Sequence, residues 1–233
     1  MSAQGSESEM LSFTHQQFLL ALAAYQDSIW PAQPVAYALG ALATVVLVKP
    51  KDLFRRLTLG ILALLWAWAA IAYHWLFFTD LTGAALLFGL LFAAQTGLLF
   101  FAAVRRRAPP DLSFRANPAG FAGAALIGYA LLVYPLLDFW LLAWPRMPWL
   151  GISPCPVTLF TLGFLLFSAP RLPVIYWVVP VAWALFEGMT AVLLGILQDW
   201  ALLLAGVAAI LLALAGDDGT RSIPPKGRAD PAG

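Results

Sequence analysis

Residues 57–104 read LTLGILALLWAWAAIAYHWLFFTDLTGAALLFGLLFAAQTGLLFFAAV, and this stretch decides the fold class of the chain. It contains two apolar runs, residues 57–78 and 82–104, which are separated by a short turn that carries Asp80. A helix that crosses the roughly 30 Å hydrocarbon core of a bilayer needs about 20 mostly apolar residues. Each run therefore predicts one membrane-spanning helix.

The composition of the whole chain agrees with this stretch. Hydrophobic residues make up 62% of the 233 residues, charged residues make up 11%, and the mean hydropathy is +0.83. A soluble domain carries about 25% charged residues, because its surface must face water. The composition therefore argues against a soluble enzyme, a disordered chain and a nucleic-acid-binding protein. Cys155 is the single cysteine, which excludes a disulfide within the chain.

Apolar runs outside this stretch raise the expected number of spans to seven. They cover residues 28–48, 118–143, 156–169, 173–196 and 199–215. We expect an all-α polytopic membrane bundle of seven transmembrane helices with an N-terminal amphipathic interfacial helix. The fifth and seventh spans are short, so a six-span arrangement with a re-entrant fifth segment stays open.

The two ends of the chain differ in character from the bundle. Residues 1–9 are polar and are predicted to be disordered. Residues 10–27 place apolar side chains at helical spacing opposite polar ones, which predicts an amphipathic helix on the periplasmic surface. Residues 28–216 then form the seven-helix transmembrane domain. Residues 217–233 are rich in glycine, proline and charge, which predicts a disordered cytoplasmic tail.

Positive charge predicts the orientation. When the loops are assigned alternately to two sides, all of the 13 Lys and Arg residues except Arg146 fall on one side. Because basic loops stay in the cytoplasm, the N-terminus is predicted to be outside and the C-terminus inside. Asp52 on the cytoplasmic side has the spacing to pair with Arg55 or Arg56 across one helical turn.

Four residues on the predicted outer side are candidates for a ligand- or ion-binding site: His74, Asp138, Cys155 and Glu187. A carboxylate at membrane depth costs about 2.5–3.5 kcal/mol on insertion scales, so Asp138 and Glu187 are expected to face the bundle interior or water. Structural roles also remain open, as a hydrogen-bonding group or as an ion pair with Arg146.

A metal site is a weaker hypothesis. Cys155, His74 and Met147 are soft or borderline ligands that suit a thiophilic ion such as Cu(I). They do not have the close spacing of a metal-binding motif such as Cys-x-x-Cys. No catalytic residue and no cofactor can be named from the sequence.

Three functions remain open. The first is the binding or translocation of a small solute or ion through a site that faces the periplasm, with Glu187 as the titrating group. The second is an accessory or assembly subunit of a larger membrane complex, and the third is a thiol- or metal-dependent redox protein that uses Cys155. The expected partners are the lipid bilayer and either other membrane subunits or further copies of this chain, but not nucleic acid.

Four segments resemble a family of bacterial membrane proteins that is described only as a domain of unknown function. They are WPAQ at residues 30–33, YHWLFF at 73–78, GISPCPVTLFTLG at 151–163 and LGILQDW at 194–200. The resemblance covers nearly the whole chain except the tail. It implies a location in the bacterial inner membrane and implies no activity.

Overall fold

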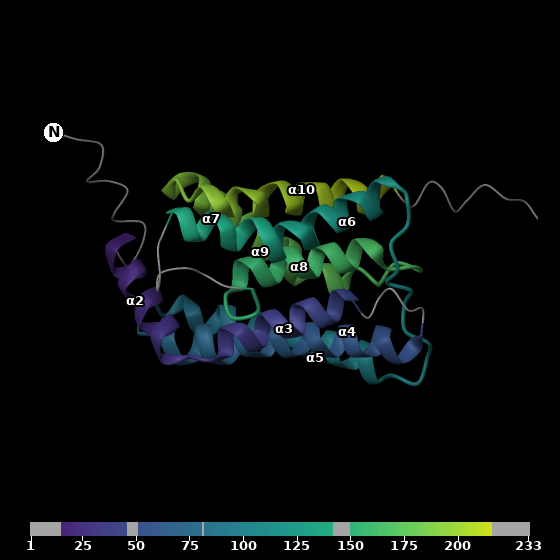
Figure 1. The fold of residues 1–233 in the computed structure, drawn as a ribbon, viewed down its shortest axis with the longest axis horizontal. Helices are drawn as coiled ribbons and strands as arrows, with labels where there is room; N and C mark the ends of the chain where they lie inside the picture. The colour runs from purple at the N-terminus through teal and green to yellow at the C-terminus, as the bar shows by residue number, and fades with distance from the viewer. Residues whose placement is uncertain (1–14, 46–50, 81, 142–149, 216–233) are drawn as a thin grey trace, which may run out of the picture.

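The computed structural model describes residues 15–45, 51–80, 82–141 and 150–215, and every regular element in these ranges is a helix (Figure 1). The N-terminal half contains α2 (His15–Ser28), α3 (Ala32–Val45), α4 (Asp52–Trp68), the π-helix η2 (Ala69–Phe78) and α5 (Ala84–Val104). The C-terminal half contains α6 (Pro118–Gly128), the π-helix η3 (Tyr129–Val133), α7 (Tyr134–Leu141), α8 (Pro154–Phe167), α9 (Ile175–Leu194), the 3₁₀ turn η4 (Leu197–Asp199) and α10 (Trp200–Ala215).

Four helices in the described ranges are long and apolar enough to cross a membrane. They cover Asp52–Phe78, Ala84–Val104, Pro118–Leu137 and Ile175–Leu193. Each coincides with one of the seven apolar runs, so the prediction of an all-helical chain with several helices able to span a membrane is confirmed. The other three runs correspond to the shorter apolar helices Ala32–Val45, Pro154–Phe167 and Leu197–Leu212. The count of seven spans remains a prediction.

The boundary between the first two helices is sharper than the sequence indicated. The apolar run was expected to begin at Ser28, but α2 continues through that residue and α3 begins only at Ala32. A turn at residues 29–31 separates the two helices, and it contains Pro31. Proline lacks an N–H and cannot continue the hydrogen-bond ladder of α2, but it is tolerated next to the start of α3.

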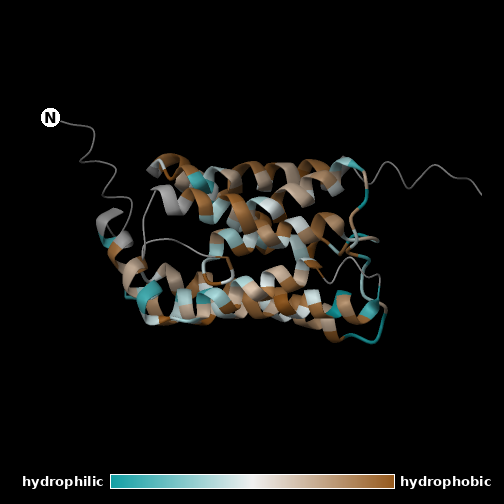
Figure 2. Ribbon diagram, viewed as in Figure 1, coloured by the Kyte–Doolittle hydropathy of each residue, from teal (hydrophilic) through white to brown (hydrophobic). Residues whose placement is uncertain are grey.

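The helices lie side by side, so the polar turns gather at the two ends of the bundle (Figures 1 and 2). One end contains the start of α4, the end of α5, the start of α6 and the end of α8; we call it the basic end. The opposite end contains α2 and the turn from α9 into α10; we call it the far end. Helix α2 lies at the far end, whereas α10 begins at the far end and finishes at the basic end (Figure 1).

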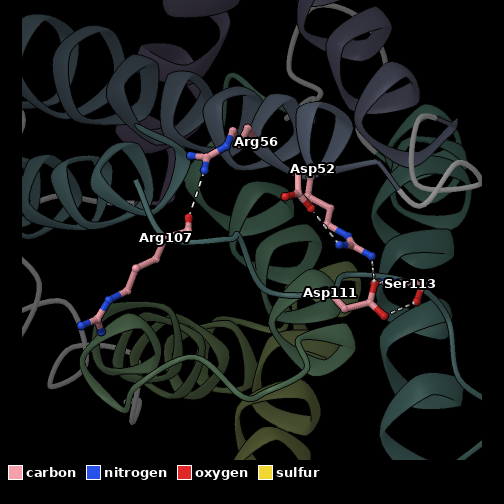
Figure 3. A network of polar contacts seen from close by, with 6 residues as sticks. Asp52, Arg56, Arg107, Asp111 and Ser113 are labelled. Carbon is pink, nitrogen blue, oxygen red and sulfur yellow. Dashed lines mark hydrogen bonds and ion pairs between the residues drawn. The ribbon is translucent and has the colours of Figure 1, made fainter. Parts of the chain in front are cut away.

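Arginines organise the basic end (Figure 3). The guanidinium of Arg56 donates to the backbone carbonyls of Ala103 and Arg105, each at 2.7 Å, and of Arg107 at 3.0 Å. These bonds satisfy carbonyls at and beyond the end of α5, where no helical N–H follows. Arg55 binds Asp52 at 3.1 Å, which confirms the pairing across one turn that the sequence predicted.

Asp111 ties the loop before α6 into the same network (Figure 3). Its carboxylate binds Arg55 at 3.1 Å and accepts hydrogen bonds from the Ser113 N–H and hydroxyl. Its backbone pairs with Ala169 at the end of α8. Partial burial acts to raise the pKa of Asp111, but the bonds from Ser113 and the charges of Arg55 and Arg115 outweigh it and hold the pKa below its usual value.

This lowered pKa predicts a pH-dependent contribution to stability. The contribution is complete above the ordinary value of 3.8 and is lost as the pH falls through the lower value of the folded protein. We expect Asp111→Asn to unfold about 2–4 °C below the unmodified protein at neutral pH. The difference in unfolding temperature between the two proteins becomes smaller as the pH falls below 3.8. Thermal unfolding in detergent at several pH values measures the effect, and a gap that widens with acid contradicts it.

Helix α8 occupies the centre of the bundle, between α3, α4 and α5 on one side and α6, α7 and α10 on the other (Figure 1). All of its residues are buried except Cys155, which is half-buried. It reaches this position because Gly123 of α6 and Gly163 of α8 face each other without side chains. The segment Leu150–Ser153 that leads into α8 is buried as well. The first turn of α8 therefore begins inside the protein.

Candidate functional site

The turn between α9 and α10 brings a carboxylate into the protein at the far end. Helix α9 is terminated by the capping residue Gly195, whose φ of +70° lies in the left-handed region that glycine adopts without strain. The chain then reverses through η4, which leaves the residue Asp199 only 8% exposed. A buried carboxylate needs hydrogen bonds or a neutralising partner, so its neighbours show what the site can do.

Two side chains from other helices hold the Asp199 carboxylate. The hydroxyl of Tyr134, the first residue of α7, donates to it at 2.5 Å. The thiol of Cys155, in the first turn of α8, also hydrogen-bonds to it. Next to it, Tyr129 donates its hydroxyl to the backbone carbonyl of Gln198 at 2.8 Å. The 3₁₀ turn is thus fastened to η3, α7 and α8.

A second carboxylate lies close to Asp199. Glu187 is on α9 two turns before the helix ends, is half-buried, and interacts electrostatically with Asp199. Tyr73 of η2 interacts electrostatically with both carboxylates and with Cys155. We call these five residues, Tyr73, Tyr134, Cys155, Glu187 and Asp199, the acid–thiol cluster. No described lysine or arginine forms an ion pair with either carboxylate.

Two π-helical segments adjoin the cluster. Tyr73 lies inside η2, and Tyr134 directly follows η3. In a π-helix each N–H bonds to the carbonyl five residues earlier, which widens the turn and shifts the direction of the following side chains. Such segments are frequent at functional sites in proteins. Here one π-helix supplies Tyr73, and the other directly precedes Tyr134.

His74 lies next to the cluster, in a box of aromatic rings. It is only 2% exposed, and its ring centroid lies 4.8 Å from that of Phe92, 5.3 Å from Trp183 and 5.9 Å from Phe88. The His74 Nε2 and Trp183 Nε1 atoms are buried and have no hydrogen-bond partner among the described residues. Trp183 precedes Glu187 by one helical turn on α9. The box and the acid–thiol cluster therefore share η2 and α9.

Tyr25 of α2 fixes the segment that leads into α8. Its hydroxyl donates to the carbonyl of Ile152 at 2.7 Å and accepts a bond from the indole N–H of Trp68 at 2.9 Å. Burial raises the pKa of the Tyr25 hydroxyl above its usual value, and the bond from Trp68 only partly offsets this, so the group stays a neutral donor at physiological pH. The N-terminal helix therefore helps to position the first turn of α8, where Cys155 lies.

The structure brings together part of the site that the sequence predicted. Cys155 hydrogen-bonds to Asp199, Glu187 interacts with Asp199 electrostatically, and His74 is adjacent to Tyr73 in the chain. Asp138 lies in α7, but its side chain is outside what the structure describes. Its inclusion in the site is therefore still a prediction.

The predicted metal site remains untested as a set, because Met147 lies outside the described residues, as does Arg146. Among the residues that are described, no three or more His, Cys, Asp or Glu side chains are grouped closely enough to hold a metal ion. The proposed ligands Cys155 and His74 belong to different parts of the site. Cys155 bonds to a carboxylate, whereas His74 is packed between aromatic rings.

Sequence reasoning did not select three members of the cluster: Tyr73, Tyr134 and Asp199. Asp199 could have been selected from the sequence, because it is an acidic residue at the start of an apolar run. The two tyrosines offered little, because tyrosine is common near membrane interfaces and a bulge into a π-helix has no clear sequence mark.

A comparison with known protein families finds a match over nearly all of the chain. Residues 15–221 match the profile of DUF6064, a family of unknown function. The chain belongs to the DUF6064 family. This confirms the resemblance to a family without an assigned activity. No curated protein and no solved structure matches this DUF6064 protein. Its function must therefore be argued from the acid–thiol cluster itself.

Proposed function

We propose that this DUF6064 protein binds a proton or a small cation at the acid–thiol cluster, within the bacterial inner membrane, and passes it to or from the periplasm. The observation that carries the proposal is the pairing of two carboxylates inside an apolar bundle. Glu187 and Asp199 interact with each other, and no described lysine or arginine neutralises them.

Charge balance explains why such a pair implies a small positive ligand. Two carboxylates close together in a medium of low dielectric constant repel each other and lose hydration. A shared proton or a bound cation removes both costs, as it does in other carboxylate pairs. The pair therefore favours an ion-handling function over a purely structural one.

The two carboxylates are not equivalent, which suggests their roles. Asp199 already accepts hydrogen bonds from Tyr134 and Cys155. Glu187 accepts no hydrogen bond from the described residues. Glu187 is therefore the group available to take up and release the ligand, and Asp199 with its two donors forms the fixed side of the site.

The location of the pair supports access from the far end. Glu187 is seven residues before Leu194, so it lies about 10 Å from the end of α9. We propose the seven-span arrangement, in which the three shorter apolar helices also span. The basic end is then cytoplasmic, and α2 lies on the periplasmic surface as an interfacial helix. The opposite positions of α2 and the end of α10 support this odd number of spans (Figure 1).

The proposal predicts a specific loss of ion handling in carboxylate variants. We expect purified protein in liposomes to increase proton or sodium entry under an imposed membrane potential. Glu187→Gln and Asp199→Asn should reduce the rate to that of empty liposomes, because each removes one of the paired charges. An internal pH-sensitive or sodium-sensitive dye measures the rate. The exposed Asp80→Asn at the same end is the matched control and keeps the rate.

Binding without transport is measured separately, by thermal unfolding in detergent. The unfolding midpoint in the presence of sodium, potassium or acid is compared with the midpoint in choline at equal ionic strength. A bound ligand at 100 times its Kd raises the unfolding midpoint by about 5–10 °C. The proposal is wrong if the unmodified protein and the Glu187→Gln/Asp199→Asn double variant behave alike in both assays. That result would favour the accessory-subunit hypothesis.

A further inference from the structure

An apolar groove runs along the outside of α9 and α10, starting from the basic end. Its volume is about 680 Å³. Trp177 and Ala209 are buried at its floor, whereas Val178 and Ile210 are exposed at its walls. Among the described residues that line it, only Arg171 is charged. The groove thus combines one cationic end with an apolar channel.

The dimensions of the groove match one leaflet of a bilayer. It extends from Val174, just before α9, to Leu185, eleven residue steps that span about 16 Å at the helical rise. Half of the roughly 30 Å hydrocarbon core is about 15 Å. Arg171 precedes this stretch and lies where the phosphate groups of a leaflet would be.

Two local contacts define the inner end and the floor of the groove. Gly206 of α10 lies so close to α9 that an added Cβ would be 3.0 Å from the Leu185 side chain, which closes the space between the helices. The indole N–H of Trp177 donates to the Leu172 carbonyl at 3.2 Å. The only polar atom of the Trp177 ring is therefore already bonded, and the rest of the ring offers apolar surface.

We propose that this groove binds one anionic phospholipid, with its phosphate at Arg171 and an acyl chain along α9. Charge complementarity selects the occupant, because a guanidinium at the mouth of an apolar channel matches a phosphate joined to a hydrocarbon chain. A zwitterionic lipid fills the same channel but gains less from the positive charge. The phosphate end of the groove is separate from the acid–thiol cluster, because Glu187 lies twelve residues beyond the start of α9, about 18 Å at the helical rise.

Native mass spectrometry of the full-length protein tests the proposal. Delipidated protein is mixed with phosphatidylglycerol or phosphatidylcholine, and the retained lipid is counted. We expect one retained phosphatidylglycerol molecule and about tenfold weaker retention in Arg171→Gln. Ala182→Trp, which fills the exposed wall, reduces retention of both lipids. Arg107→Gln is the control, because Arg107 is exposed at the same end but does not line the groove.

Brominated acyl chains give a second readout, since they quench nearby tryptophan fluorescence. We expect brominated phosphatidylglycerol to quench the unmodified protein more than Trp177→Phe. The proposal is overturned if Arg171→Gln and Ala182→Trp, eluting as the unmodified protein does in gel filtration, retain phosphatidylglycerol fully. It is also overturned if inorganic phosphate displaces the lipid at equal concentration, because the site would then bind any anion.

Discussion

Gly163→Leu is expected to lose about 3 kcal/mol or more of folding free energy, enough to remove much of the stability of a typical domain. A Cβ at residue 163 would lie 2.6 Å from Cγ1 of Ile127 and 2.8 Å from the carbonyl oxygen of Gly123. Both are too close for real atoms, and the second belongs to the backbone, which cannot rotate away. The larger side chain must therefore push α6 and α8 apart.

The reciprocal contact strengthens this expectation. A Cβ at Gly123 would lie 2.7 Å from the carbonyl oxygen of Gly163. Each backbone therefore occupies the space that a side chain on the other helix would need. Close approach of this kind is a main source of helix association in membranes, where burial of apolar surface adds little.

Thermal unfolding in detergent measures the loss, together with the yield of monodisperse protein. Gly97→Leu on α5 is the matched control, because no atom lies within 4 Å of an added Cβ there. That variant is expected to be as stable as the unmodified protein. Equal stability of the two leucine variants would show that the α6–α8 contact is not close in the folded protein.

Tyr25→Phe is the second substitution with a large expected effect, about 2–3 kcal/mol. It removes one oxygen but leaves two partners without a bond: the buried carbonyl of Ile152 and the indole N–H of Trp68. The cost of a buried group without a partner exceeds the net value of the hydrogen bond itself. The segment that leads into α8 should loosen as a result.

The readouts are the unfolding midpoint and the rate at which a thiol reagent labels Cys155. We expect a lower midpoint and labelling about tenfold faster, because local opening exposes the first turn of α8. Tyr176→Phe is the control, since the Tyr176 hydroxyl donates no hydrogen bond to any described residue. If Tyr25→Phe changes neither quantity, Tyr25 does not hold the segment in place.

Some features could be predicted because they depend on neighbours in the chain. The pairing of Asp52 with Arg55 follows from their spacing on one helix, and it is present in the structure. The resemblance of the YHWLFF and PCPVT segments to a family was also sufficient to indicate the family. The sequence also placed Arg55 and Arg56 before the second apolar helix, whereas α4 begins at Asp52 and includes both in its first turns.

Other features depend on contacts between distant parts of the chain. The bond from Tyr134 to Asp199 joins residues 65 positions apart, and that from Tyr25 to Ile152 joins residues 127 positions apart. No periodic pattern in the sequence indicates such pairs. The carboxylate Glu187 could be singled out by its cost in a membrane, but its neighbour Asp199 and the tyrosines could not be assigned to it.

The sequence alone determined that this chain forms apolar helices long enough for a bilayer, because that property depends only on local length and composition. The tertiary structure decided which face of each helix points inward and that the short helix α8 is the central one. The reason is physical: lipid tails and a protein interior are almost equally apolar, so a membrane helix needs no polar face to mark its outside. Close-fitting glycines and a few buried hydrogen bonds set the arrangement instead.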